Sequence, residues 1–387
     1  MNKIKFSLKR PVYSEILIYD HVGSEFIIEA LGGTFSWQVL RTRDRRINLH
    51  PTVLLRLWSA LIRSYRVEKS LTTVRRSRLV AELAEISAIS PRAVLTFVDN
   101  SARFNVLSRL YPDAAFLAIQ NGFRGIEVGG MAHYLSATNF FCFGEDTKNR
   151  YQRFGCNIDN YVIGGSLKDG LYRGRHYEPP DHVFDYCWIS QFRPARFSRT
   201  LPGLAQSSIL LLKFLSKFCE ENSKSLVIAG SCKPDLVEQE VQFLSSFVDV
   251  ERISFVPNDP STFSSYQIID QSEVSVTVNS TLGFEALSRG KKVIFCNFTE
   301  DEYYDVPSMD EDAPWIIKGS ATTYALFAKK LENAYQMGRR EWSKVTDRDA
   351  QNFVNTSVST LPQEVLRREV TRLVSGHDTV QCRDNVV

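Results

Sequence analysis

The chain has 387 residues, which is more than one ordinary hydrophobic core accommodates, so its length favours two domains. With 43% hydrophobic, 12% aromatic and 24% charged residues, its composition is that of a folded protein and excludes extensive disorder. A formal net charge of +3 is too small to indicate a nucleic-acid partner, and we expect none.

The sequence predicts a cytoplasmic protein without a structural metal. It contains no run of eighteen apolar residues, and its first residues lack the apolar core and cleavage site of a secretory signal. The seven cysteines are scattered and form neither a CxxC pair nor a Cys/His cluster, so we expect free thiols.

The N-terminal half carries much of the positive charge. Arginines at helical intervals, among them Arg56 and Arg63, are interspersed with large apolar side chains between Leu54 and Ile62. This pattern is typical of a helix that rests on an anionic membrane surface, and equally of a solvated helix face. Both interpretations stay open at the level of sequence.

Short apolar runs alternate with helical segments through the first half of the chain. Such alternation predicts an α/β fold with a parallel, doubly wound sheet. The strands are predicted at 16–19, 39–41, 93–98, 115–119, 139–143 and 161–163, with helices at 25–29, 51–89, from about 104 and toward 154.

A basic, proline-bearing segment at 173–182 has the composition of a linker, and we place the domain boundary there. The predicted domains are 1–178 and 179–375, followed by a disordered tail at 376–387. Strands of the second domain are predicted at 186–189, 225–229, 253–256, 274–278, 292–296 and 314–317, and helices at 207–219, 261–270, 282–288, 321–336 and 362–374. The two halves are Rossmann-like, and a cleft between their carboxyl strand ends is expected.

The stretch 266–298 carries the clearest chemical signal. A predicted strand ends in Asn279, Ser280 and Thr281, which precede a short helix. A helix start has unpaired backbone N–H groups and partial positive charge, so it can hold a phosphate. Gly283 permits close approach of a neighbour or ligand, and Glu285 could accept hydrogen bonds from ribose hydroxyls. The alternative is that Asn279 and Ser280 only cap the helix and that Glu285 is a solvated or structural carboxylate.

Several short motifs occur in a fixed order along the chain: DNS at 99–101, IQNGFRG at 119–125, FGE with Tyr-x-x-x-Gly at 143–155, GGSLKDG at 164–170, ISQF at 189–192 and VNSTLGFEALSRGKKVIF at 278–295. In this order they resemble the bacterial GT-B glycosyltransferases of surface carbohydrate synthesis, over about residues 15–300. More narrowly, the chain is similar to the capsule and O-antigen group that includes transferases of Kdo, an eight-carbon acidic sugar, from CMP-Kdo.

The resemblance implies a GT-B fold, in which two Rossmann-like domains face each other across a cleft and the second domain holds the nucleotide. The residues that it implies for the nucleotide-sugar donor are Gly230, Ser231, Pro257, Asn258, Asn279, Ser280, Thr281, Gly283 and Glu285. A glycan or lipid-linked acceptor is expected to meet Asp20, Asn100, Gln120, Asn121, Arg124 and Gln191. Arg124 suits an acidic sugar or phosphate.

Sugar transfer needs a group that removes a proton from the acceptor hydroxyl. Asp99 and Glu145 are the predicted carboxylates, although either could instead serve a helix N-terminus. His21 follows a strand-end aspartate and is a further candidate base.

No metal or other cofactor is expected. The Asp-x-Asp pairs at 310–312 and 347–349 do not follow strand ends, and we interpret them as solvated surface. Two other interpretations remain: a polyol-phosphate transferase or nucleotide-sugar epimerase of the same architecture, or a non-catalytic scaffold of a polysaccharide assembly complex.

Overall fold

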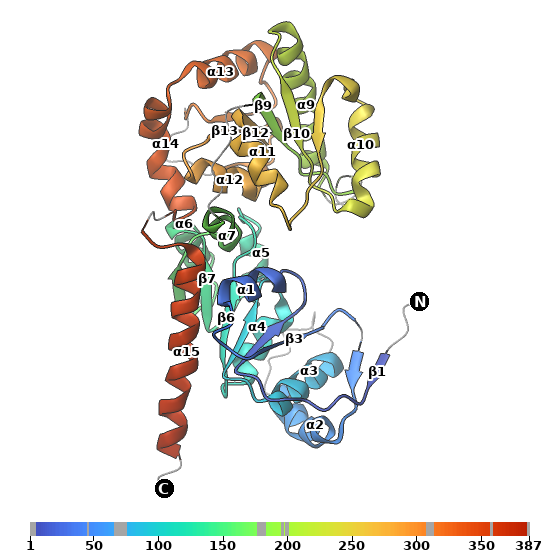
Figure 1. The fold of residues 1–387 in the computed structure, drawn as a ribbon, viewed down its shortest axis with the longest axis vertical. Helices are drawn as coiled ribbons and strands as arrows, with labels where there is room; N and C mark the ends of the chain where they lie inside the picture. Colours follow the sequence, from blue (N-terminus) through green and yellow to red (C-terminus); the bar gives the residue numbers. More distant parts are fainter. Residues whose placement is uncertain are drawn as a thin grey trace. The chain divides into compact units, whose positions relative to one another are not determined.

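Two parallel six-stranded sheets form the cores of two separate units in the computed structural model, which describes residues 5–44, 46–65, 76–175, 183–194, 197, 201–306, 313–356 and 359–384 (Figure 1). Unit 1 comprises residues 1–122, 128–171 and 357–387. Unit 2 comprises residues 123–127 and 172–356. The chain therefore passes between the units four times.

The sheet of unit 1 has the strand order β3-β2-β5-β6-β7-β8, and all neighbours are parallel. The connections after β2 and after β5 run in opposite directions along the sheet, so the order reverses between these two strands. The strands are β2 (Ile16–Tyr19), β3 (Trp37–Leu40), β5 (Ala93–Thr96), β6 (Ala115–Ile119), β7 (Asn139–Cys142) and β8 (Asn160–Ile163); β1 (Lys5–Ser7) and β4 (Arg46–Asn48) pair separately.

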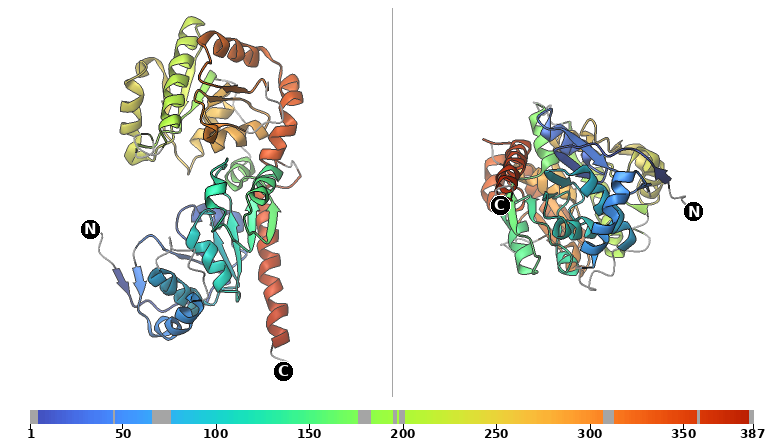
Figure 2. Two further views of the ribbon diagram at one scale, coloured as in Figure 1. Left: turned by 180° about the vertical axis from the view of Figure 1, so that it is seen from behind. Right: turned by 90° about the horizontal axis from the view of Figure 1, so that it is seen from below.

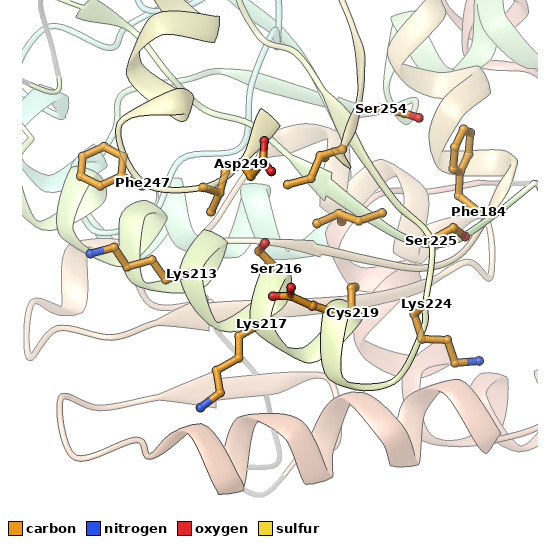
Figure 3. Close-up of a pocket in the computed structure, with 14 residues that line it drawn as sticks. Phe184, Lys213, Ser216, Lys217, Cys219, Lys224, Ser225, Phe247, Asp249 and Ser254 are labelled. Atoms are coloured by element: carbon orange, nitrogen blue, oxygen red, sulfur yellow. The ribbon is translucent and has the colours of Figure 1, made fainter. Parts of the chain in front are cut away.

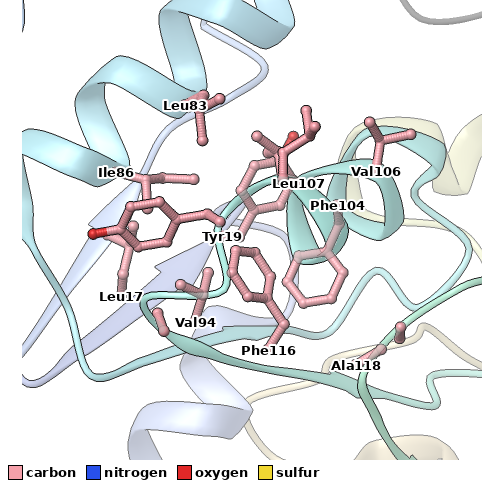
Figure 4. Packing of buried hydrophobic residues seen from close by; sticks show 14 of the residues in the cluster. Leu17, Tyr19, Leu83, Ile86, Val94, Phe104, Val106, Leu107, Phe116 and Ala118 are labelled. Carbon is pink, nitrogen blue, oxygen red and sulfur yellow. The ribbon is translucent and has the colours of Figure 1, made fainter. Parts of the chain in front are cut away.

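The central strands of unit 1 are buried on both faces, which explains why their sequences are continuously apolar. On one side, Tyr19, Phe104 and Phe116 form a ladder of aromatic rings whose successive centroids lie 5.5 and 5.3 Å apart (Figure 4). The Tyr19 hydroxyl donates to Glu82 at 2.6 Å, and burial raises the pKa of both groups. Arg78 and Arg103 pair with the same carboxylate, which compensates its burial.

Helices cover the sheet of unit 1: α1 (Ser24–Leu31), α2 (Pro51–Ser64), α3 (Arg76–Ile89), α4 (Ala102–Leu110), α5 (Val128–Met131), α6 (Glu145–Arg153), α7 (Leu167–Gly174, crossing into unit 2) and α15 (Pro362–Asp384). The last helix, drawn in red in Figure 2, packs against α1. There the Arg367 guanidinium donates to the Ala30 carbonyl at 2.8 and 3.2 Å.

The sheet of unit 2 has the order β11-β10-β9-β12-β13-β14, again fully parallel. Numbered along the chain, this is 3-2-1-4-5-6, the order of a dinucleotide-binding Rossmann sheet. Its strands are β9 (Phe184–Ile189), β10 (Leu226–Ala229), β11 (Ser254–Val256), β12 (Ser272–Thr277), β13 (Lys292–Asn297) and β14 (Ile316–Lys318).

The α-helices of unit 2 are α9 (Pro202–Glu221), α10 (Val237–Ser245), α11 (Ser264–Asp270), α12 (Thr281–Ser288), α13 (Tyr324–Gln336) and α14 (Arg339–Phe353). Short 3-10 turns lie at η2 (Pro234–Leu236), η3 (Val250–Arg252) and η4 (Glu302–Tyr304). None of the helices in the described part of the chain is both long and apolar enough to cross a bilayer.

The α/β prediction with two parallel Rossmann-like sheets is confirmed, and each predicted strand matches an observed one to within two residues at either end. The domain limits differ. The predicted boundary at 178 lies outside the described residues, and α15 belongs to unit 1 because it packs against α1, β5 and β6 rather than against unit 2. The tail predicted from 376 to be disordered is instead helical to Asp384. Four helices, α5, α7, α10 and α14, were not predicted.

Asp185 fixes the amino-terminal end of β9 in unit 2. Its carboxylate accepts hydrogen bonds from the Ser225 amide and hydroxyl, both at 2.8 Å, and from the Tyr335 hydroxyl at 2.6 Å; Lys224 lies 3.3 Å away. Lys224 and Ser225 also line a cavity of about 470 Å³ at this end of the sheet (Figure 3). Although burial works against ionisation, these donors lower the pKa of Asp185 to about 2.

We expect Asp185→Asn to reduce the free energy of unfolding at pH 7 by about 1 kcal/mol, a value discounted for the partial exposure of the carboxylate. Because the pKa of Asp185 in the folded state lies below its ordinary value, the stabilisation is present above pH 4 and is lost as the pH falls toward 2. Urea unfolding from pH 7 to pH 2.5 measures this, and the two proteins should converge at the acid end. A constant difference across the range would contradict the assignment.

Candidate functional site

The carboxyl ends of β9 and β12 meet where the strand order of unit 2 reverses, which is the position of the ligand crevice in open α/β sheets. Gln191 follows β9 and Asn279 follows β12. The Gln191 side-chain oxygen accepts from the Asn279 amide at 3.0 Å and from the Thr277 hydroxyl at 3.2 Å, while its nitrogen donates to the Asn279 side chain at 3.0 Å. This bridge holds the two strand ends in one fixed arrangement.

The helix α12 begins directly behind this bridge. Ser280 occupies the N-cap position, and its carbonyl accepts from the Gly283 amide at 2.9 Å, yet its hydroxyl makes no capping hydrogen bond. The capping alternative is therefore wrong for the Ser280 side chain. The position combines a helix N-terminus with a half-buried hydroxyl that the helix does not use, which suits an anionic group.

Thr281 is already engaged within unit 2. Its hydroxyl oxygen accepts from the Phe123 amide at 2.9 Å, and the Phe123 ring stacks on Phe284 with a centroid distance of 3.8 Å. This packing places residues 123–127, including Arg124, in unit 2. We predicted Arg124 to be part of the N-terminal domain, and that placement is wrong because the aromatic contacts of Phe123 attach the segment to α12.

Gly283 approaches the sheet rather than open space. A Cβ at this position would lie 2.9 Å from Thr277 Cγ2 and 3.0 Å from Phe295 Cε1, so only glycine allows α12 to pack this closely. Glu285, one turn from the helix start, is buried and accepts from the Tyr266 hydroxyl at 2.7 Å. Its predicted contact with ribose stays a prediction, and such a contact would need the other carboxylate oxygen.

Gly230 and Ser231 follow β10, next to β9. A Cβ at Gly230 would lie 2.7 Å from the Phe255 ring, which explains the glycine. On the outer strand β11, the following residues are tied to α11: the Pro257 carbonyl accepts from Ser264 at 2.7 Å, and the Asn258 side chain accepts from Ser265 at 3.4 Å. The predicted donor residues thus follow β10, β11 and β12 along one edge of this sheet.

Glu240 organises these strand ends and was not predicted. Its fully buried carboxylate accepts hydrogen bonds from the Ser190 hydroxyl, from the Ser231 amide and hydroxyl, each at 3.1 Å, and from the Cys232 amide at 2.9 Å. One buried anion therefore joins the loops that follow β9 and β10. The sequence does contain a signal for the helix that carries Glu240: the amphipathic segment VEQEVQFL, which forms α10, follows a Pro-Asp pair typical of a helix start.

The polar residues predicted in the first half lie along the carboxyl edge of four adjacent strands of unit 1, β2, β5, β6 and β7. After β2, Asp20 adopts a left-handed backbone with φ of 80°. Its buried carboxylate accepts from the Val22 amide at 3.2 Å and from Arg43 at 2.7 Å, and the His21 ring lies 3.4 Å away. The His21 side chain itself is 45% exposed.

The two predicted catalytic carboxylates have different surroundings. Asp99 is buried, and the helix after it is capped by Ser101, whose hydroxyl accepts from the Phe104 amide at 3.3 Å, so the capping alternative for Asp99 is wrong. Glu145 is the first residue of α6, half exposed, and 3.4 Å from Lys148. Of the two, Glu145 is the carboxylate that solvent reaches.

The predicted side-chain amides of unit 1 also differ in their exposure to solvent. Gln120 is buried and links β6 to β7, because its side-chain oxygen accepts from the Phe143 amide at 2.8 Å and its nitrogen donates to the Gly122 carbonyl at 3.0 Å. Asn100 is exposed and Asn121 half-buried. Gln191, predicted to meet the acceptor, lies in unit 2 beside Asn279, so it joins the residues predicted for the donor.

Metal ligands do not gather in the described part of the chain, where no group of three His, Cys, Asp or Glu side chains could hold an ion. The pair at 310–312 lies outside the described residues. In α14, Asp347 is exposed but Asp349 is buried, so our interpretation of 347–349 as solvated surface is wrong for Asp349.

Comparison with known proteins gives a family and a fold. Residues 117–359 match the model of a family described as "putative O-antigen biosynthesis protein". A comparison with curated proteins gives no match.

Solved structures similar to the chain include an epimerase, a polymerase and a glycosyltransferase. A UDP-GlcNAc 2-epimerase from Neisseria meningitidis bound to UDP-GlcNAc is 12% identical, with a TM-score of 0.51 over 93% of this chain and 98% of that one. The wall teichoic acid polymerase TagF is 11% identical, with a TM-score of 0.55 over 95% of this chain and 92% of that one. A glycosyltransferase from Rickettsia africae is 13% identical, with a TM-score of 0.50 over 95% of this chain and 98% of that one. At these identities the likeness shows a shared GT-B fold.

Replacement of Glu240 tests the order at these strand ends. We expect Glu240→Ala to lower the free energy of unfolding by about 3 kcal/mol, because it leaves several buried donors without an acceptor. Glu240→Gln should cost less, since its amide oxygen can still accept from the Ser231 and Cys232 amides while the hydroxyls of Ser190 and Ser231 rotate to accept. Urea unfolding of both variants measures the difference; equal losses would show that the shape of the side chain does not matter.

Proposed function

Because the chain belongs to the O-antigen biosynthesis family whose model it matches, we propose that it is a GT-B glycosyltransferase of bacterial surface polysaccharide synthesis. The observation that carries the proposal is the meeting of Gln191, Asn279 and Ser280 at the point of strand-order reversal in unit 2, directly before α12. The motif order of the sequence supports the same interpretation.

We assign the nucleotide-sugar donor to unit 2. Its phosphate would lie at the start of α12, where the Ser280 hydroxyl makes no capping hydrogen bond and the helix N-terminus carries partial positive charge. The loops after β10 and β11, with Ser231 and Asn258, would line the nucleoside. The similar epimerase from Neisseria meningitidis, which is bound to UDP-GlcNAc, supports a nucleotide site on this fold.

We assign the acceptor to unit 1, along the strand ends that carry Asp20, Asn100 and Asn121. Transfer requires that the acceptor hydroxyl lose its proton as its oxygen bonds to the anomeric carbon, while the bond from that carbon to the phosphate breaks and the nucleotide leaves. Glu145 is the preferred base because its carboxylate is half exposed, whereas Asp99 is buried. His21 is the second choice.

The donor that we test first is CMP-Kdo, and the support for it is the sequence resemblance alone. The donor is a substrate, and the proposal includes neither a metal nor another cofactor. It places the protein in the cytoplasm with a peripheral contact to the membrane that would carry a lipid-linked acceptor.

A nucleotide-sugar epimerase is the second candidate, favoured by the likeness to the UDP-GlcNAc 2-epimerase over nearly the whole of both chains. The likeness to TagF supports a third candidate, a polyol-phosphate transferase. Product analysis separates the three: a new glycosidic bond, an epimerised donor, or a phosphodiester. A scaffold protein would give none of these and would tolerate the loss of Glu145.

Donor binding should protect the purified protein against thermal unfolding. At a donor concentration of a hundred times Kd, the expected protection is about 2.7 kcal/mol. Ser280→Ala should weaken Kd about 5- to 30-fold through the loss of one hydrogen bond to a charged group. Ser245→Ala on the exposed side of α10 is the matched control and should bind as the wild type does. If none of CMP-Kdo, UDP-sugars and CDP-glycerol protects the protein, the assignment of a donor site to unit 2 is contradicted.

Glu145→Gln should lower kcat about 10²- to 10⁴-fold, because the amide cannot accept the proton. Donor Kd should stay unchanged, since the residue lies in unit 1. Lys148→Gln removes the ion-pair partner without removing the carboxylate and should keep most of the activity. Steady-state kinetics with the donor that gives protection measure both variants. Full activity of the Glu145 variant would transfer the role of base to Asp99 or His21.

A further inference from the structure

Exposed large apolar side chains gather in one part of unit 1. Of fifteen such side chains in the described residues, eleven lie between Phe6 and Tyr65. Five of the eleven belong to α2 and its C-cap: Leu54, Leu55, Trp58, Ile62 and Tyr65, which are 44, 80, 72, 49 and 66% exposed. We call these five residues the α2 apolar face. Burial of this much apolar surface would be favourable, and exposed apolar patches of this kind mark interaction sites.

The arrangement of α2 explains why this face exists. At 100° per residue, Val53, Ala60 and Ser64 lie on one side of the helix and are buried, because α2 packs against α3 there (Figure 1). The α2 apolar face occupies a separate arc of about 100°. The helix is therefore apolar on two sides, and only one of them serves the core of unit 1.

Positive charge borders the α2 apolar face. The segment 51–65 contains Arg56 and Arg63 and no acidic residue, and Arg63 forms an ion pair with Asp113 at 3.0 Å. The guanidinium of Arg76 lies 4.7 Å from the Tyr65 ring centroid. The same N-terminal part of unit 1 holds a cleft of about 390 Å³ whose charged lining residues are Lys9, Arg10, Arg41, Arg46 and Glu85, four cations to one acid.

We propose that the α2 apolar face inserts into the interface of an anionic lipid bilayer, with α2 parallel to the membrane plane. Tryptophan and tyrosine beside leucine and isoleucine, bordered by arginine, is the composition of a helix that lies in such an interface. Arginine is attracted to the negative surface of the bilayer. A second copy of this chain is less suitable, because a symmetric contact would place Arg56 of both copies in the same interface. The inference does not depend on which sugar reaction unit 2 performs.

Fluorescence of Trp58 provides a direct test on the full chain. Trp188, Trp315 and Trp342 are fully buried, so Trp37→Phe leaves Trp58 as the only exposed tryptophan of the chain. In this background, vesicles of phosphatidylglycerol and phosphatidylcholine should shift the emission to shorter wavelength, and lipids brominated on the acyl chain should quench it. Vesicles of phosphatidylcholine alone should bind at least tenfold more weakly.

Two variants and one control complete the test by vesicle co-sedimentation. Leu55→Gln with Ile62→Gln should reduce partition into anionic vesicles at least tenfold. Arg56→Gln should reduce it about fivefold and lessen its dependence on salt. Leu326→Gln with Val345→Gln removes two apolar side chains of unit 2 that are 47 and 46% exposed, and this variant should bind as the wild type does.

Thermal unfolding checks that each variant folds, and donor protection checks unit 2 without membranes. The proposal is overturned if the wild type does not bind anionic vesicles, or if the variant with Leu55→Gln and Ile62→Gln binds them as the wild type does. It is also overturned if the wild type forms a dimer that the α2 variant abolishes while neither protein binds lipid, because the face would then be covered by a second copy.

Discussion

The parallel pairing of β9 with β12 is the interaction on which the candidate site depends. Tyr186 lies in register with Val274 and Trp188 with Val276, so both strands end at the same level. The connections from these two strands leave in opposite directions, so a crevice that can hold polar side chains forms at their carboxyl ends. Gln191 and Asn279 occupy it and bond to each other. The pairing therefore fixes both the position of the crevice and the direction of α12.

Satisfying buried polar groups then shapes the surroundings of that crevice. Glu240 places a carboxylate beneath the loops after β9 and β10, where it meets amide and hydroxyl donors from both. In unit 1, Gln120 performs a similar task between β6 and β7. These two residues are buried and hold the strand ends, while Ser280 and Glu145, at the carboxyl edges of the same two sheets, are at least partly exposed. The side chains that hold each edge together are thus different from those that we propose to meet the substrates.

The strands were predictable because each is a short, doubly buried apolar run, as in Ala115–Ile119, whose limits agree with the structure. Helix α14 was missed because its sequence is strongly polar, with Trp342 and Phe353 among its few anchors to the core. The membership of residues 123–127 in unit 2 depends on Phe123 stacking on Phe284, which is 161 residues away in the chain, and local patterns carry no such information. Likewise, Glu285 looks available in sequence, and only the bond to Tyr266 reveals that it is engaged.

The return of α15 to unit 1 makes unit 2 an insertion within unit 1, and this has a consequence for biosynthesis. The helix packs against α1, β5 and β6, whose sequences are translated more than two hundred residues earlier. Until residues 362–384 have left the ribosome, the surface of unit 1 that α15 covers, including the Ala30 carbonyl, has no helix over it. Unit 2 can complete its sheet during synthesis, whereas unit 1 begins first and is finished last. A chain that stops at residue 356 would thus retain the whole of unit 2 and an unfinished unit 1.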